Sequence, residues 1–432
     1  MEESNVSKVY VTSPVKVSTT SEQNEDIAFS QVANEKRSSK VAILFCHGMG
    51  QQVPYETITN VAEALQKNIK QDTFKISQAL FGDDTYARVE GVIENKNGER
   101  REVHIYEAYW APFCERQISF WETVKFLISS GMAGIGFAFG KGFVRWIFGG
   151  FRKFKESWLK IPIFVLVTLV VAIISFGPPL LICYAIFSGK ELNILNVLLY
   201  YILPVGVTVG AYNFVKKFIG DVAIYVSSHK LNKYYETRAK IKECALKISK
   251  SIYSAISDDD GNYLYENVVL VGHSLGSVII YDTLNSLINM DDIADTSKKV
   301  KKLNILDRTK YLITFGSPLD KTAFIFRSQV KERSEIREAL AASKQPMVVD
   351  YRFRPDRWVN IYSWLDLVSA RLRYYDWPEW EDSKNPKRII NLQDREALTL
   401  ANLLGIFYLR AHSQYWNHDL LVSTLLKAVF AR

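Results

Sequence analysis

The residue best placed to do chemistry is a serine at the centre of residues 268–281, which read VVLVGHSLGSVIIY. A short apolar run rich in β-branched residues precedes Gly272, and an apolar run able to continue as a helix follows Gly276. The spacing G-x-S-x-G between a strand and a helix is typical of a tight turn that carries a nucleophilic serine, here Ser274. A Cβ at either glycine would collide with the neighbouring strand or helix, and the turn would place the N–H of Leu275 at a helix start.

A serine hydroxyl needs a base to take its proton and an acid to orient that base. The sequence has six histidines, and His412 and His418 are the two that follow Ser274. His273 lies inside the turn and cannot fold back onto the hydroxyl of its own neighbour with good geometry. His412 is expected on a loop after a helix, whereas His418 is expected within the closing helix. The sequence therefore favours His412 as the base, with His418 as the alternative.

Three aspartates compete for the acid. Asp366 lies just past an expected strand at 358–364, within reach of the late histidine loop. Asp320 follows the expected strand 309–315, and Asp356 is the third competitor. Asp366 is favoured, and it could also cap a following helix without losing a catalytic role.

A second glycine-containing loop precedes the serine in the chain. Residues 41–46 (VAILFC) form an expected buried strand that runs directly into His47-Gly48-Met49. Glycine at this place lets the backbone pass close to a substrate, so that the N–H of Met49 can point at an oxyanion.

Taken together, HGMG, GHSLGS, FGSP, an aspartate after a strand and a late histidine resemble the α/β-hydrolase superfamily, and FGSP resembles its lipase-like branch in particular. The resemblance implies a mainly parallel sheet with helices on both faces. It also implies that Ser274 is the nucleophile, His412 the base and Asp366 its partner, with the amides of Met49 and Leu275 forming the oxyanion hole. His47, Gly48, Gly272 and Gly276 would support these motifs. The resemblance covers about two thirds of the chain.

The chain divides by composition into a polar tail, a split catalytic domain and an insertion. Within the catalytic domain, two strands at 88–93 and 102–110 are expected to form a hairpin, because an Asn-Gly pair lies in the turn between them. The expected parts are a disordered tail at 1–40, the α/β-hydrolase domain at 41–112 and 236–432, and a membrane-associated helical insertion at 113–235.

The insertion contains two long runs without a charged residue. The run 161–187 exceeds the ~20 residues that cross a bilayer, and a second run at 192–214 follows a very short link. These runs predict a transmembrane helical hairpin before the serine turn. Residues 126–150 are apolar but interrupted by Lys141 and Arg145, so we expect an interfacial or re-entrant helix there. Lysines and arginines flank the pair on both outer sides, which places the catalytic domain of an integral membrane protein on the cytoplasmic side.

Composition narrows the function classes further. Hydrophobic content of 48% argues against a mainly disordered protein. The net charge of +8 is not gathered into one stripe, which favours a bilayer over nucleic acid as partner. The four cysteines are scattered without a CxxC pair, so we expect reduced thiols, and no metal or other cofactor.

The sequence thus predicts a membrane-anchored serine hydrolase that cleaves carboxylic esters, with a lipid or other acyl ester as substrate. A thioesterase or an acyltransferase would use the same residues. A catalytically silent interaction protein on a hydrolase fold is the alternative from another class. The sequence does not indicate an oligomeric state.

Overall fold

The structure is a computed structural model of the 432-residue chain. It describes the continuous ranges given in the next sentence and, besides them, a few scattered positions between 122 and 132 and between 202 and 225. The continuous ranges that it describes are 9–11, 15–16, 40–49, 53–69, 74–114, 143–154, 160–188, 193–198, 234–257, 262–296, 301–328, 335–376, 387–404 and 410–431.

A ten-stranded sheet forms the centre of the molecule, in the order β1-β4-β5-β6-β3-β9-β10-β11-β12, with β2 beside β4. From β6 to β12 neighbouring strands run parallel, whereas β1, β2, β4 and β5 pair antiparallel. The strands are β1 (Val9–Val11), β2 (Val15–Lys16), β3 (Lys40–Cys46), β4 (Lys75–Phe81), β5 (Asp84–Glu94), β6 (Arg100–Ala108), β9 (Tyr265–His273), β10 (Thr309–Phe315), β11 (Arg357–Tyr362) and β12 (Ile389–Gln393).

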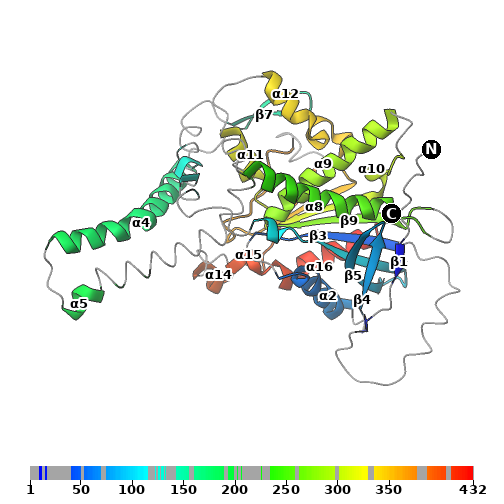
Figure 1. The fold of residues 1–432 in the computed structure, drawn as a ribbon, viewed down its shortest axis with the longest axis horizontal. Helices are drawn as coiled ribbons and strands as arrows, with labels where there is room; N and C mark the ends of the chain where they lie inside the picture. The colour runs from blue at the N-terminus through cyan, green and yellow to red at the C-terminus, as the bar shows by residue number, and fades with distance from the viewer. Residues whose placement is uncertain are drawn as a thin grey trace.

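Helices cover both faces of this sheet: α8 and α9 lie on one face, and α2 and α16 lie on the other (Figure 1). The described helices are α2 (Glu56–Ile69), η2 (Ala111–Phe113), α4 (Lys160–Phe187), α5 (Ile194–Val197), α8 (Tyr235–Ser254), α9 (Leu275–Thr296), α10 (Ile305–Arg308), α11 (Leu319–Ser328), α12 (Glu335–Ser343), α13 (Pro346–Val349), η7 (Tyr351–Phe353), α14 (Leu400–Leu404), α15 (Arg410–Ser413), η10 (Tyr415–Asn417) and α16 (Asp419–Val429).

The alternation of side chains along each strand produces two hydrophobic cores. In β3, Val41 and Ile43 face the core under α2 and α16, whereas Ala42 and Leu44 face the core under α8 and α9. Because both faces are covered, the parallel strands can be apolar at every position, which is why VAILFC shows no alternation.

The α/β class, the mainly parallel sheet and the helices on both faces agree with the sequence prediction. The predicted hairpin is also confirmed, because β5 and β6 pair antiparallel around the turn at residues 95–98. The sequence missed β4 and β12. It also missed β1 and β2, two short strands within the segment predicted to be a disordered tail; the rest of residues 1–39 lies outside the described part.

The predicted transmembrane hairpin is not supported, and the prediction of an integral membrane protein is corrected with it. Within the described part of the chain, no helix combines the length and the apolar character that crossing a bilayer requires. Helix α4 does form over the first run, with Pro178 and Pro179 inside it. The second run is described as a helix over the four residues of α5, and most of 192–214 lies outside the described residues.

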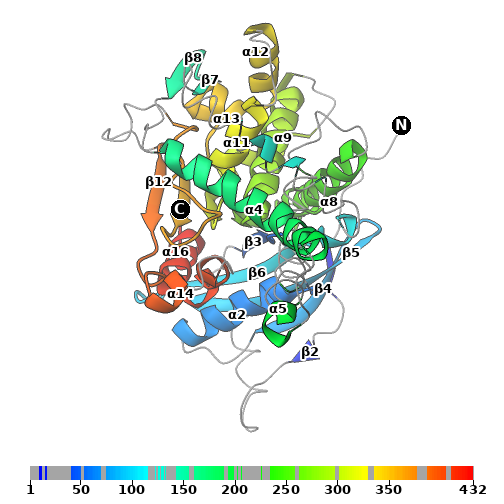
Figure 2. The same cartoon turned by 90° about the vertical axis from the view of Figure 1, so that its left-hand side faces the viewer.

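The predicted interfacial helix at 126–150 also differs from the structure at its end. Residues Phe143–Ile147 and Gly150–Phe154 form strands β7 and β8 of a separate two-stranded hairpin. Arg145 anchors this hairpin, because its guanidinium donates to the Tyr374 carbonyl at 2.9 Å and to the Gln345 side chain at 3.0 Å. The charged residue that interrupts the apolar run therefore contacts residues 345 and 374, which lie outside the predicted insertion. Figure 2 shows β7 and β8 close to α13.

Candidate active site

The carboxyl ends of four parallel strands meet at one edge of the sheet. The loops after β3, β9, β10 and β11 all start there, since these strands are neighbours in the sheet. Those loops carry His47, Ser274, Gly316 and Asp366. Ligands bind at this edge in open parallel α/β sheets, so the topology gathers the predicted residues where chemistry is expected.

Ser274 occupies a strained turn between β9 and α9. Its φ of +53° lies in the left-handed region, which costs free energy for a residue with a side chain. Neighbouring backbone holds it there: the Ser274 N–H donates to the Phe315 carbonyl at 3.0 Å, and the Ser274 carbonyl accepts from Ser277 N–H at 3.0 Å. The turn predicted from G-x-S-x-G is therefore present, and the adjacent strand β10 fixes it.

Both flanking glycines are required by close backbone contacts. A Cβ on Gly272 would lie 2.5 Å from the Cα of Ser277. A Cβ on Gly276 would lie 2.1 Å from the carbonyl oxygen of Cys46. The start of α9 therefore packs directly on the end of β3, and this contact sets the position of Ser274 relative to the loop after β3.

We expect Gly276→Ala to destabilise the protein by about 3 kcal/mol, since the added methyl can be accommodated only by moving α9 away from β3. The same movement would reduce labelling of Ser274 by a serine-reactive phosphonate. Urea unfolding and labelling of the purified variant measure both effects. Gly98→Ala is the matched control, because Gly98 has a φ of +75° but nothing within 4 Å of its Cβ position. Its strain of about 1–2 kcal/mol should leave labelling at the wild-type level. Normal labelling of the Gly276 variant would contradict this role.

The structure brings His412 and Asp366 together. His412 Nδ1 lies 2.9 Å from Asp366 Oδ2, and 5% of the histidine and 4% of the aspartate are exposed. Because the carboxylate accepts the Nδ1 proton, the neutral ring keeps its lone pair on Nε2. This is the tautomer that a general base for a serine requires.

The competing residues are engaged elsewhere. Asp320 accepts the backbone N–H groups of Arg373 at 2.8 Å and Tyr374 at 3.2 Å. Asp356 is half exposed and pairs with two lysines. His418 pairs with Asp394, with 2.6 Å between Nδ1 and Oδ2. None of these alternatives forms a pair with His412 among the described residues.

Further partners keep Asp366 charged and fixed. Burial alone would raise the pKa of Asp366, but the nearby His412 ring and three hydrogen bonds outweigh it and hold the pKa well below its usual range. Two of those bonds come from the Val368 N–H at 2.8 Å and the Tyr415 hydroxyl at 2.9 Å. Burial, and then the charge of Asp366, raise the pKa of Tyr415 far above 10, so the phenol stays a donor.

The loop that carries Asp366 is also held from outside. The ammonium group of Lys321 lies 2.6–3.2 Å from the carbonyl oxygens of Leu367, Val368 and Ser369. Lys321 and Tyr415 are therefore supporting residues that sequence reasoning missed. The position of Tyr415, three residues after His412, was the one available signal.

Ser274 and His412 leave complementary groups unsatisfied. Ser274 is 0% exposed, and its Oγ has no hydrogen-bond partner in the described part of the chain. The same is true of His412 Nε2. One group can donate a proton and the other can accept it, and such catalytic bonds are often not closed without substrate. Because the hydroxyl is fully buried, a substrate has to displace the atoms that cover it.

The loop after β3 passes across the serine. A Cβ on Gly48 would lie 2.8 Å from Ser274 Cβ, so a glycine is needed for this approach. Met49 is buried next to it. On the other side, Leu275 is the first residue of the 22-residue helix α9, so its N–H has no acceptor within the helix and lies at the positive end of the helix dipole. Leu275 thus follows the serine directly, and Met49 follows the glycine that approaches it.

His47 stabilises this loop and does not face the serine as a base. Its Nδ1–H donates to the Gly48 carbonyl at 2.8 Å, and its Nε2 accepts the Trp110 N–H at 3.0 Å. The ring stacks on Trp110 at 4.7 Å, and burial lowers the pKa of His47 to about 4. His47 is therefore a neutral link between β3 and the segment after β6.

One other cluster of titratable side chains is held together by ion pairs and hydrogen bonds. Glu90, Glu102 and His104 lie close enough together to share a cation. However, Glu90 is bound by Arg88, and His104 Nε2–H donates to the Glu102 carboxylate at 2.8 Å. We therefore assign no metal to them. The four cysteines are all described and are free thiols, as predicted.

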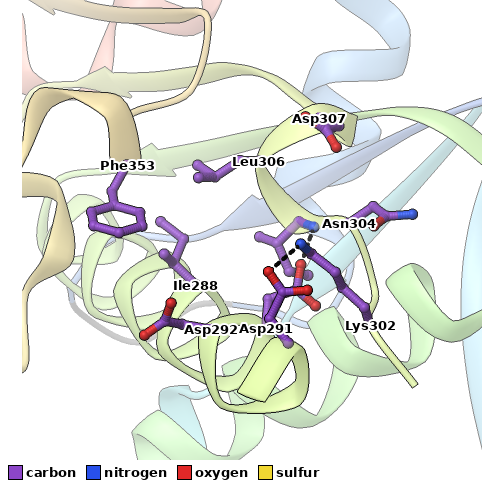
Figure 3. A pocket seen from close by; sticks show the side chains of 10 residues that line it. Ile288, Asp291, Asp292, Lys302, Asn304, Leu306, Asp307 and Phe353 are labelled. Carbon is purple, nitrogen blue, oxygen red and sulfur yellow. Dashed lines mark hydrogen bonds and ion pairs between the residues drawn. The ribbon is translucent and has the colours of Figure 1, made fainter. Parts of the chain in front are cut away.

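Cavities also occur away from the triad. One of about 160 Å³ lies at the end of α9 and contains Asp291, Asp292 and Lys302 (Figure 3). Both carboxylate oxygens of Asp291 already accept backbone N–H groups, from Leu303 and Ile305. A second cavity, of about 340 Å³, lies between α2 and the start of α16.

No family model, curated protein or solved structure matches this chain.

Proposed function

We propose that this protein is a serine hydrolase that cleaves carboxylic esters through an acyl-enzyme on Ser274. The observation that carries the proposal is the buried Asp366–His412 pair, whose unpartnered Nε2 lies in the same site as a serine on a strained strand–helix turn. A buried pair of this kind has no need of a free Nε2 for stability, and an unsatisfied buried nitrogen costs free energy. The unpartnered Nε2 is explained if this nitrogen accepts a proton during a reaction.

In the proposed reaction, His412 Nε2 takes the Ser274 proton as Oγ attacks the ester carbonyl carbon. The charge that develops on the carbonyl oxygen is stabilised by the N–H groups of Met49 and Leu275. His412 then returns the proton to the leaving alkoxide, and the acyl group stays on Ser274. Water, deprotonated by His412, attacks the acyl carbon, and the carboxylic acid leaves as the serine regains its proton.

A lipid acyl ester is the substrate class that we propose within this activity. Its support is the resemblance of the FGSP step at residues 315–318 to lipase-like enzymes, together with the complete burial of the serine. A thioesterase or an acyltransferase is the second candidate, since the same residues would serve any acyl transfer and the two differ only in leaving group and acceptor.

A fluorophosphonate probe tests the proposal, because it reacts with a serine that is activated by a base. The wild-type protein should be labelled, and Ser274→Ala should show no labelling. Ser413→Ala is the matched control: Ser413 lies beside His412, but its hydroxyl donates to the Arg410 carbonyl, so labelling should be unchanged.

The same preparation should hydrolyse p-nitrophenyl esters and release fatty acids from lipid esters. A folded wild-type protein that is not labelled, or equal labelling of Ser274→Ala, would show a silent hydrolase fold and refute the activity. Faster turnover of acyl thioesters, or transfer to an added alcohol, would instead favour the second candidate.

A further inference from the structure

His273 is a buried imidazole that the reaction above does not use. It is the residue before the nucleophile, and a base at this place cannot reach the serine hydroxyl. Its ring nevertheless contacts three parts of the site. His273 Nε2 lies 3.1 Å from the carbonyl oxygen of His412, and the two rings stack with centroids 4.9 Å apart and planes 29° apart.

The other contacts of the ring fix it in place. His273 stacks on Phe315 at 4.8 Å and meets the edge of Trp416 at 5.4 Å. Its Nδ1 lies 2.9 Å from the Cβ position of Gly48, and its Nε2 lies 3.2 Å from that of Gly316. Both neighbours are glycines, so the backbone approaches the ring from two loops.

We propose that His273 is a positioning residue for His412, holding the backbone of the catalytic histidine through the Nε2–H and its ring through stacking. The inference rests on the proposed function, because it assigns a role to the support of the base. The acceptor is a carbonyl oxygen, so the proton of His273 must be on Nε2. Nδ1 is then the unprotonated nitrogen and faces the loop after β3. One ring therefore links the base to the loop that would hold the oxyanion.

The charge state of His273 suits this role. Burial, followed by repulsion from His412, lowers the pKa of His273 to about 3. The groups that face it are His412, the more distant Asp366 and His47, and the neutral phenol of Tyr415. His273 thus stays neutral while His412 becomes an imidazolium during the reaction. A lysine or arginine at the same place would donate to the carbonyl but would repel that cation.

Two substitutions separate the hydrogen bond from the packing. His273→Phe keeps an aromatic ring between its neighbours and removes the donor, whereas His273→Gln keeps an N–H donor near the place of Nε2. With a short-chain p-nitrophenyl ester, we expect H273F to lower kcat by roughly ten- to a hundred-fold, since the buried His412 carbonyl loses its partner. KM should change by less than about three-fold, because the ring touches the base and not the bound ester. H273Q should recover kcat to within about ten-fold of wild type.

A proton NMR spectrum distinguishes positioning of His412 from a general contribution of His273 to stability. The far-downfield resonance of the His412 Nδ1 proton shared with Asp366 should persist in H273Q and broaden or disappear in H273F, measured at a temperature where thermal unfolding shows both variants to be folded. Wild-type kcat in H273F, or an equal loss of kcat in both variants, would overturn the positioning role. Failure of the wild-type protein to turn over ester or to be labelled would instead refute the proposed function itself.

Discussion

Replacing Asp366 by asparagine is expected to lower kcat by roughly 10⁴-fold, as in other triads in which the acid becomes an amide. The carboxylate accepts the Nδ1 proton of His412 at 2.9 Å. An amide can donate through its NH₂ group at the same position, which favours the tautomer with the proton on Nε2. The base would then present a proton to Ser274 in place of a lone pair. Steady-state ester hydrolysis and the rate of fluorophosphonate labelling measure this loss.

Asp320→Asn is the matched control, because Asp320 was the main competitor on sequence grounds. Its carboxylate accepts two backbone N–H groups, and an asparagine oxygen can keep one of them. Its effect should therefore fall on stability, by about 1 kcal/mol, with kcat within a few-fold of wild type. Retained activity in the Asp366 variant, or a comparable loss in the Asp320 variant, would reject Asp366 as the acid.

Acid should destabilise the fold between about pH 6.5 and pH 4, because the buried His47 and His273 stay neutral in the native state. The buried His104, whose pKa burial also lowers, acts in the same direction. Burial lowers the pKa of His47 to about 4, and burial together with the neighbouring His412 lowers that of His273 to about 3. In the unfolded chain both would titrate near 6.5. The unfolded state thus binds more protons in this window, so the free energy of unfolding falls as the pH falls. From pH 7 to pH 4.5 each histidine should remove about 2.5 kcal/mol, about 5 kcal/mol together.

Such a loss is comparable to the whole stability of many domains. Urea unfolding at pH 7 and pH 4.5 measures it. The buried carboxyl of Glu107, whose pKa burial raises, acts in the opposite direction and offsets part of the loss. Below about pH 4 Asp366 adds a further acid-dependent loss, because it takes up a proton in the unfolded chain while its lowered pKa keeps it charged in the native state. H273Q should remove the loss of about 2.5 kcal/mol that His273 contributes, and an unchanged pH dependence in this variant would refute the assignment.

The correction of the insertion shows where hydropathy alone was insufficient. Residues 161–187 carry no charge, and α4 forms over nearly the same range. Yet Arg145, which interrupts the apolar pattern of residues 126–150, donates to Tyr374 and Gln345 in the part of the chain that follows the insertion. The end of the 126–150 segment thus belongs to a strand hairpin attached to that domain. A hydropathy pattern reports transfer free energy and does not identify the surface against which a segment packs.

The sequence by itself determined the serine turn and the central parallel strands beside it. Gly272 lies near the end of β9, Gly276 lies at the start of α9, and Ser274 lies between them. Local sterics allow few other structures for that pattern. The buried strands β3, β9 and β10 were likewise readable, because each is a short run that is apolar at every position. The choice of Asp366 and His412 used chain order and the expected ends of strands.

Only the tertiary structure decided how these residues meet and what supports them. Asp366 and His412 are 46 residues apart, and their 2.9 Å contact depends on the order of parallel strands at the carboxyl edge of the sheet. The supporting role of His273 could not be predicted from the sequence for the same reason. Its partner is the backbone carbonyl of residue 412, and since every residue has a carbonyl, the sequence does not indicate which one accepts. The chemistry of a side chain follows from its residue type alone. The spatial distance between residues far apart in the chain is set by the packing of the elements between them.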